Sequence, residues 1–260
     1  MRESELYRLD GFSRKLQGWY ASPAGQVLHA ELQDTLDQLL SGLFGYYALQ
    51  VGALSLQADS MQSSPIGQKV YMTLDTECGT LAASPLALPF QQDTLDLIVL
   101  LHTLDFSHDP HQVLREAHRV LISEGHLVLV GFNPVSMMGL GRLALKHTSR
   151  VPWVGHFYTA KRLKDWFSLL DFSVVQTEYV GLRPPVQNMR VQQRLQFLNH
   201  AGRYGLARLG GVRIFVAKKR VLTLTPRLQP WRPRQRVLPV NVAEPSAREA
   251  SHARAGRYLH

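Results

Sequence analysis

The sequence is poor in cysteine and has no long apolar run. Its 260 residues include a single cysteine, Cys78, so neither a disulfide framework nor a cysteine-based zinc site can form within this chain. The longest strongly apolar run, Leu97–Leu101, is far too short to cross a bilayer, and Met1–Glu5 lacks the basic-then-apolar pattern of a signal peptide. We therefore predict a soluble, unprocessed, cytoplasmic protein with no membrane partner.

Acidic residues are scarce in the C-terminal third. Residues 182–220 hold nine Lys and Arg and no Asp or Glu, and residues 221–260 hold seven against two. Such a region can meet the phosphates of RNA, DNA or anionic lipid, or it can form a solvated face with a solubilising tail. No nucleic-acid-binding motif accompanies the basic residues of 182–260, so we favour the solvated face and keep nucleic acid as the alternative.

The composition separates the chain into three parts. Beyond residue 221, prolines alternate with arginines and little aliphatic periodicity is present, so we predict that 221–260 is a disordered Pro/Arg-rich tail. The apolar content of 45% and the absence of internal repeats favour one main domain in the rest. We place an α/β domain at 45–220 and an N-terminal helical segment at 1–44.

Local patterns predict alternating helices and strands. Ser22-Pro23 is a typical helix start, and leucines recur at helical spacing up to Leu43. The continuous apolar run Asp96–Leu101, the helix start Asp109-Pro110 and the strand His126–Val130 after Gly125 predict a right-handed βαβ unit. The connection between Gly52 and Lys69 is expected to be short or irregular. The remaining expected elements are strands at Tyr46–Val51, Lys69–Leu74, Thr80–Ala83, Phe172–Tyr179 and Val212–Lys218, and a helix capped by Thr159.

The middle of the chain carries a set of short motifs. They are Leu88-Pro89-Phe90, Leu95-Asp96, His102-Thr103-Leu104-Asp105, Asp109-Pro110, Leu114-Arg115-Glu116, Arg119-Val120-Leu121, Gly125 and Gly131-Phe132-Asn133-Pro134. In these motifs the chain resembles the class I S-adenosylmethionine-dependent methyltransferases of the type 11 group, and in the last one a smaller bacterial branch of that group. The resemblance implies a Rossmann-like α/β fold with seven mostly parallel strands, the last of them antiparallel.

The resemblance also implies where S-adenosyl-L-methionine would bind. In the family, a glycine-rich turn lets the backbone approach the cofactor, an acidic residue after the second strand holds the ribose, and the loop before Leu-Pro-Phe holds the adenine. The chain departs from that pattern at the turn, where Gln50 replaces the acid and Leu54 stands at a glycine position. The positions predicted to bind the cofactor are Gly52, Asp75, Ser84, Pro85, Leu86, His102 and Leu104.

Candidate catalytic residues follow the fourth strand. His102 and Asp105 stand where such residues face the methyl acceptor in the family, and Tyr158 could approach from the following segment; a solvated loop histidine is the alternative for His102. The histidines and aspartates of 102–111 match no standard metal geometry, so we predict no metal. Asn133-Pro134 is read as a turn at a strand end, although some amino-methylating relatives use such a pair.

Two functions stay open at this level. The first is transfer of a methyl group from S-adenosyl-L-methionine to an unidentified acceptor, most simply a small molecule. The second is a catalytically inactive methyltransferase fold that serves as a binding or interaction module, which the altered glycine turn favours. A nicotinamide-dependent oxidoreductase is disfavoured because no Gly-x-Gly-x-x-Gly follows the first strand.

Overall fold

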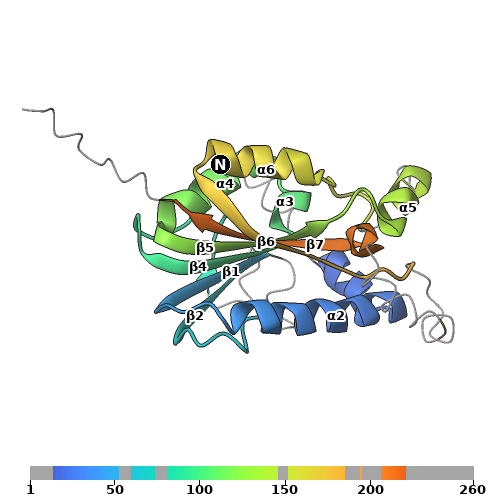
Figure 1. The fold of residues 1–260 in the computed structure, drawn as a ribbon, viewed down its shortest axis with the longest axis horizontal. Helices are drawn as coiled ribbons and strands as arrows, with labels where there is room; N and C mark the ends of the chain where they lie inside the picture. Colours follow the sequence, from blue (N-terminus) through green and yellow to red (C-terminus); the bar gives the residue numbers. More distant parts are fainter. Residues whose placement is uncertain are drawn as a thin grey trace, which may run out of the picture. The chain divides into compact units, whose positions relative to one another are not determined.

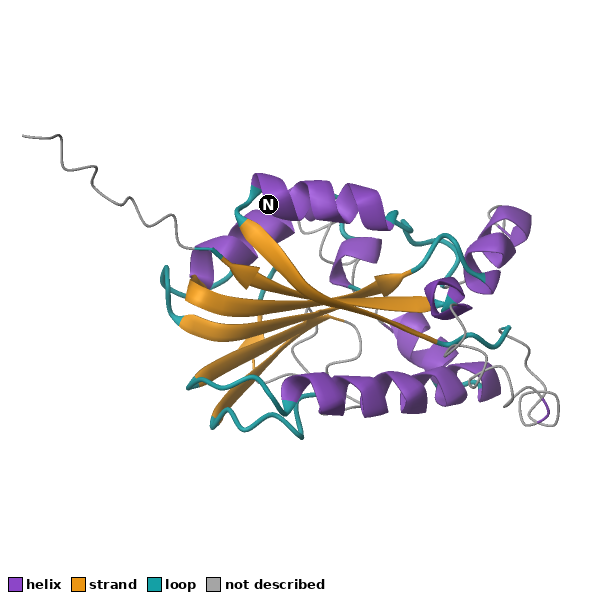
Figure 2. Ribbon diagram, viewed as in Figure 1, coloured by secondary structure: helices purple, strands orange, loops and turns teal. Residues whose placement is uncertain are grey.

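A seven-stranded sheet forms the centre of the molecule (Figures 1 and 2). The computed structural model describes residues 14–52, 60–73, 81–145, 152–184, 194 and 206–220. The strand order is β3-β2-β1-β4-β5-β7-β6. The strands are β1 Tyr47–Gly52, β2 Gln68–Thr73, β3 Leu81–Ala82, β4 Leu95–Leu101, β5 Leu121–Phe132, β6 Phe172–Val180 and β7 Val212–Lys219.

The directions of the strands confirm the fold that the motifs predicted. Strands β3, β2, β1, β4 and β5 pair in parallel, and β7 runs antiparallel to both of its neighbours, β5 and β6. At the centre, Ile98 of β4 is in register with Leu49 of β1 and Leu127 of β5. This is the mostly parallel, Rossmann-like sheet with an antiparallel last strand.

Helices cover both faces of the sheet, with α2 on one side and α4 and α6 on the other (Figures 1 and 2). The predicted cap residues begin them: the side-chain oxygens of Ser22, Asp109 and Thr159 accept hydrogen bonds from backbone amides in the first turns of α2, α4 and α6. The helices are α2 Pro23–Leu40, α3 Thr103–Phe106, α4 Pro110–Val120, α5 Met137–Leu145 and α6 Ala160–Leu169, with a 3-10 turn at Leu206–Leu209. Residues 14–20 are also helical.

The apolar run of β4 is buried on both faces, which explains why it lacks polar alternation. Leu97, Val99 and Leu101 pack in the cluster that contains the leucines of α2. Ile98 and Leu100 pack in the cluster built from α4 and α6. Each fully buried side chain of this kind contributes about 1.5–3 kcal/mol relative to an exposed one, so β4 anchors both layers.

The structure differs from the expected elements in several places. Strand β5 begins at Leu121, directly after α4, so Gly125 lies inside the strand rather than in a turn before it. The residues that β5 gains at its start are accommodated by a shift in its pairing with β4, between Leu95 and Leu97. Helices α3 and α5 were not expected. Asp75, the expected disordered tail 221–260 and part of the irregular connection after Gly52 lie outside the described residues. Of the helices in the described ranges, none is both long and apolar enough to span a membrane.

Candidate functional site

The carboxyl ends of β1, β4 and β5 meet at one edge of the sheet, where open α/β folds bind their ligands. Two hydrogen bonds tie these ends together. The His102 amide donates to the Val130 carbonyl at 2.9 Å, and the Thr103 hydroxyl donates to the Val51 carbonyl at 2.9 Å. Residues that follow β4 are therefore held directly beside the turn that ends β1.

A buried chain of polar side chains lies at this edge. His102 Nδ1 is 2.9 Å from Asp105 Oδ2, and His102 Nε2 is 2.7 Å from the hydroxyl of Tyr20. Asp105 Oδ2 also accepts a hydrogen bond from the Phe132 amide at 2.9 Å. Tyr20, His102 and Asp105 are exposed by only 1%, 1% and 3%. The histidine ring stacks on Phe132 with centroids 4.1 Å apart, so His102 is not a solvated loop residue.

Electrostatics determine the protonation of this chain. Burial raises the pKa of Tyr20 well above its ordinary value of 10.0, and the nearby negative charge of Asp105 adds to the rise. Burial also raises the pKa of Asp105, although the hydrogen bond from His102 opposes that effect. The phenol of Tyr20 is therefore protonated at neutral pH and can serve as a hydrogen-bond donor to His102 Nε2. Such an aligned chain can move a proton along its length.

Gly52 is required by close packing of the backbone. Its φ is 131°, and a Cβ on this residue would lie 2.1 Å from the Leu101 carbonyl oxygen. No side chain fits there. The need for glycine at the end of β1 thus arises from the approach of β1 to β4, whether or not a cofactor binds.

Gln50, two residues earlier, has unsatisfied polar atoms. It is fully buried, and neither its amide oxygen nor its amide nitrogen has a hydrogen-bond partner in the described part of the chain. A buried amide without partners costs about 1–3 kcal/mol. An orphaned group at the end of β1 is what a polar ligand would satisfy, so the residues present fit a cofactor at this position.

The predicted adenine-binding loop is held by α4. Arg119 donates to the carbonyls of Leu88 and Phe90 at 2.9 Å each, and Glu116 accepts from the Leu88 amide at 2.9 Å. Immediately before this clamp, the Ser84 hydroxyl accepts from the Leu86 amide at 3.3 Å, closing a tight turn. These contacts tie the Leu88-Pro89-Phe90 motif to Glu116 and Arg119 of α4.

The other predicted site residues make contacts of a different kind. Leu104 is buried in the core between the sheet and α4. The ring of Tyr158 packs against Trp166 of α6 with centroids 4.9 Å apart, and its carbonyl accepts from Arg213. Pro85 is buried. The cofactor and catalytic roles of all these residues stay predictions.

The Asn133 side chain is occupied by structural contacts. Its amide nitrogen donates to the carbonyls of Arg208 and Gly210 at 2.8 and 2.9 Å, and its amide oxygen accepts from the Val135 amide at 3.2 Å. The Asn-Pro pair thus holds the end of β5 to the entry of β7, as expected for a turn. Within the described ranges, no group of three His, Cys, Asp or Glu could hold a metal ion.

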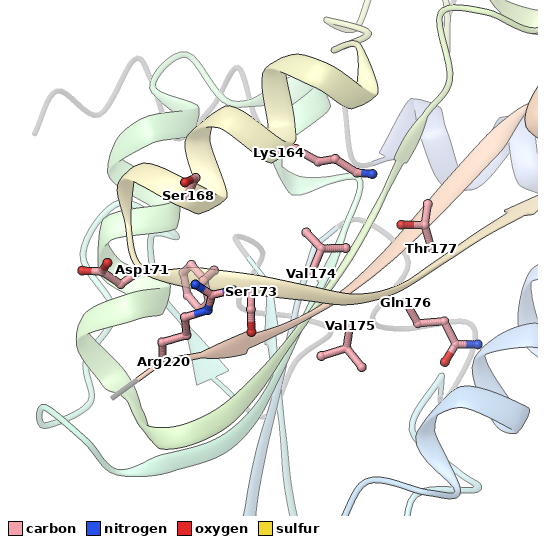
Figure 3. A pocket seen from close by; sticks show the side chains of 10 residues that line it. Lys164, Ser168, Asp171, Ser173, Val174, Val175, Gln176, Thr177 and Arg220 are labelled. Carbon is pink, nitrogen blue, oxygen red and sulfur yellow. The ribbon is translucent and has the colours of Figure 1, made fainter. Parts of the chain in front are cut away.

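A groove of about 530 Å³ lies along β6, at the outer edge of the sheet (Figure 3). Strands β5 and β7 separate β6 from β4, so this groove is distinct from the polar chain at the end of β4. A second groove, of about 490 Å³, lies between α2 and β6. The first groove is lined by Lys164, Ser168, Asp171, Phe172, Ser173, Val174, Val175, Gln176, Thr177 and Arg220.

Comparison with known proteins identifies the family. Residues 47–129 match the model of a methyltransferase domain. Over 212 residues the chain is 32% identical to the uncharacterized protein YafS of Escherichia coli (strain K12), covering 80% of this chain and 82% of YafS. The chain belongs to the class I S-adenosylmethionine-dependent methyltransferase family, in its type 11 group.

Solved structures of class I methyltransferases share the architecture. An S-adenosylmethionine-dependent methyltransferase from Thermotoga maritima aligns with a TM-score of 0.61 and 14% identity, over 82% of this chain and 99% of its own. Geranyl diphosphate C-methyltransferase from Streptomyces coelicolor, solved with S-adenosyl-L-homocysteine, aligns with a TM-score of 0.51 and 14% identity, over 75% of this chain and 81% of its own. At these identities the likeness shows the class I methyltransferase fold alone.

Tyr20 is the component of the candidate site that the motifs did not predict. It precedes the predicted α2 helix and is 82 positions away from His102, so no local spacing connects the two residues. The only indication in the sequence is the aromatic pair Trp19-Tyr20 just before the Ser22-Pro23 helix start. In this methyltransferase-family chain, the N-terminal helical segment contributes a side chain to the candidate site.

Proposed function

We propose that this chain is an S-adenosyl-L-methionine-dependent methyltransferase that acts on a small-molecule acceptor. The observation that carries the proposal is the buried Tyr20–His102–Asp105 chain at the carboxyl edge of the sheet, beside the turn at Gly52. Tyr20, His102 and Asp105 are almost fully enclosed, so an acceptor needs a local opening to reach them, and a small molecule needs a smaller opening than a large folded polymer.

The cofactor supplies an electrophilic methyl group on a sulfonium. Gln50 and Gly52 would hold its amino-acid end, and the loop Ser84-Pro85-Leu86 would hold its adenine, with Asp75 at the ribose as the family pattern implies. The orphaned amide of Gln50 supports this assignment, since a ligand there would satisfy it. The clamp that Arg119 and Glu116 form on Leu88 keeps the adenine loop in place.

The polar chain would remove a proton from the acceptor as methyl transfer proceeds. An acceptor hydroxyl or amine that reaches the phenol oxygen of Tyr20 gives it a proton, while the phenol proton passes to His102 Nε2. Asp105 keeps the imidazole in the required orientation and stabilises the imidazolium. The number of protons is conserved: one leaves the acceptor and one arrives on His102. Positioning of the acceptor in line with the methyl group supplies much of the remaining effect.

Calorimetric titration with S-adenosyl-L-methionine and S-adenosyl-L-homocysteine tests the cofactor assignment. We expect binding in the micromolar range, weakened at least about tenfold in Gln50→Leu and in Asp75→Ala, since each loses a buried or charge-assisted hydrogen bond. Asp171→Ala, at the exposed edge near β6, is the matched control and should bind normally. Unchanged affinity in both test variants would remove these residues from the site.

The alternative function is a non-catalytic binding module with the same fold. Two features favour it: Leu54 stands at a glycine position of the family, and packing alone explains Gly52. Absence of heat with both ligands, from protein shown to be folded, would make it the better proposal. If the ligands bind, production of S-adenosyl-L-homocysteine in the presence of fractionated small-molecule extract, and its loss in Tyr20→Phe, would identify an acceptor.

A further inference from the structure

Helix α5 and the residues just before it present apolar side chains to solvent. Val135, Met137 and Leu140 are exposed by 64%, 51% and 58%; we call these three residues the α5 patch. Met138, between them, is buried and attaches the helix to the core. Figure 2 shows α5 extending away from the sheet. Single exposed aliphatic residues are ordinary, but three within six positions, one just before and two on a projecting helix, indicate a contact surface.

The chain around the α5 patch is basic. Residues 131–164 contain six Lys and Arg and no Asp or Glu. Among them, Lys161 and Lys164 are exposed in the first turns of α6. This is the end of α6 that follows α5 along the chain (Figure 1). Positive charge in the same stretch of the chain as the patch complements an anionic partner.

The combination of aliphatic and cationic side chains indicates which anionic partner fits. Helices that bind membrane surfaces insert aliphatic side chains between lipid headgroups while lysines and arginines meet the phosphates. Binding to single-stranded nucleic acid would instead need exposed aromatic side chains for stacking on bases, and the α5 patch has none. The chemistry of the patch thus favours lipid over nucleic acid.

We propose that the α5 patch docks onto the surface of an anionic lipid bilayer, with basic side chains from the same stretch of the chain meeting lipid phosphates. Surface docking needs no spanning helix, so it is compatible with the absence of one from the described ranges. Helix α5 follows the end of β5, where Phe132 contacts His102, so docking would bring the candidate site close to the lipid surface. The inference does not depend on the proposed methyl transfer.

Cosedimentation of the full chain with lipid vesicles tests this proposal. We expect binding to vesicles that contain phosphatidylglycerol, weaker binding to pure phosphatidylcholine, and a loss of binding with added salt. Met137→Glu/Leu140→Glu should lower the affinity about tenfold or more, because two inserted apolar side chains are replaced by charges that the lipid repels. Leu169→Glu, 78% exposed near the other end of α6, is the matched control and should bind like the wild type.

Several results would overturn the proposal. All variants retain the basic residues 221–260, so equal binding by Met137→Glu/Leu140→Glu and Leu169→Glu would assign the lipid contact to another part of the chain. Absence of binding to either vesicle would exclude lipid. Light scattering that shows a dimer lost only in Met137→Glu/Leu140→Glu would assign the patch to a second copy. An oligonucleotide affinity lost only in that variant would assign it to nucleic acid. The substituted positions are exposed, and thermal unfolding checks that each variant is folded.

Discussion

Substitution of Gly52 by alanine should destabilise the protein strongly. The φ of 131° belongs to a region that side chains rarely adopt, which costs about 1–3 kcal/mol. The new Cβ would lie 2.1 Å from the Leu101 carbonyl oxygen, and moving that backbone costs about 1–3 kcal/mol more. The reduced entropy of the unfolded chain offsets about 0.4–1 kcal/mol of this loss. The expected net change in the free energy of unfolding is about 1–6 kcal/mol, a large part of the total stability of a typical domain.

Equilibrium unfolding in urea, followed by tryptophan fluorescence, measures this change. Trp19 and Trp166 are both buried and report on opposite faces of the sheet. Gly67→Ala is the matched control, because a Cβ at Gly67 meets no atom within 4 Å and its φ is not in the strained range. We expect the control to unfold within about 0.5 kcal/mol of the wild type.

A small effect would refute the packing argument. If Gly52→Ala unfolds within about 0.5 kcal/mol of the wild type, the close approach of β1 to β4 does not require glycine. A large effect has its own consequence for function: loss of cofactor binding in Gly52→Ala would then report disruption of the turn. Gln50→Leu is therefore the better probe of the cofactor.

Three further substitutions test the contacts that shape the site and its support. Tyr20→Phe leaves a buried histidine nitrogen without its hydrogen-bond partner and should cost about 1–3 kcal/mol in urea unfolding, whereas Tyr46→Phe, at a mostly exposed ring, should cost nothing. The hydrogen bond from Arg119 lowers the pKa of Glu116 from 4.5, so the carboxylate stabilises the fold above pH 4.5 and loses this effect as the pH falls through the lowered pKa. Glu116→Gln should therefore be about 1 kcal/mol less stable at pH 7, and the difference should disappear in strong acid; a difference that persists there would contradict the assignment. Lys219→Met removes three hydrogen bonds to oxygens near the end of α4 and should lower the unfolding free energy by about 2–4 kcal/mol, and a change below about 0.5 kcal/mol would show that the lysine is not needed there.

The sequence determined the scaffold because its signals are local. A continuous apolar run such as Leu97–Leu101 of β4 is typical of a strand buried on both faces, and a capping aspartate before proline is a local signal for the start of α4. A strand followed by a helix and a second parallel strand forms a right-handed crossover, which places the carboxyl ends of the two strands at the same edge of the sheet. The fold class and the position of His102 and Asp105 after β4 follow from such patterns, whereas the hydrogen bond between the two side chains is seen only in the structure.

Only the tertiary structure decided what surrounds that pair. Tyr20 reaches His102 because the helix at 14–20 packs over the carboxyl edge of the sheet, a contact across 82 positions that no periodicity encodes. Burial of His102 depends on Phe132 and Tyr20 together, so the motif alone could not separate a solvated histidine from an enclosed one. The exposed α5 patch was equally hidden, because an apolar helix shows in sequence only that it is apolar. Packing against segments that are distant in the sequence decides which side of α5 meets the core. A local sequence pattern does not contain that information.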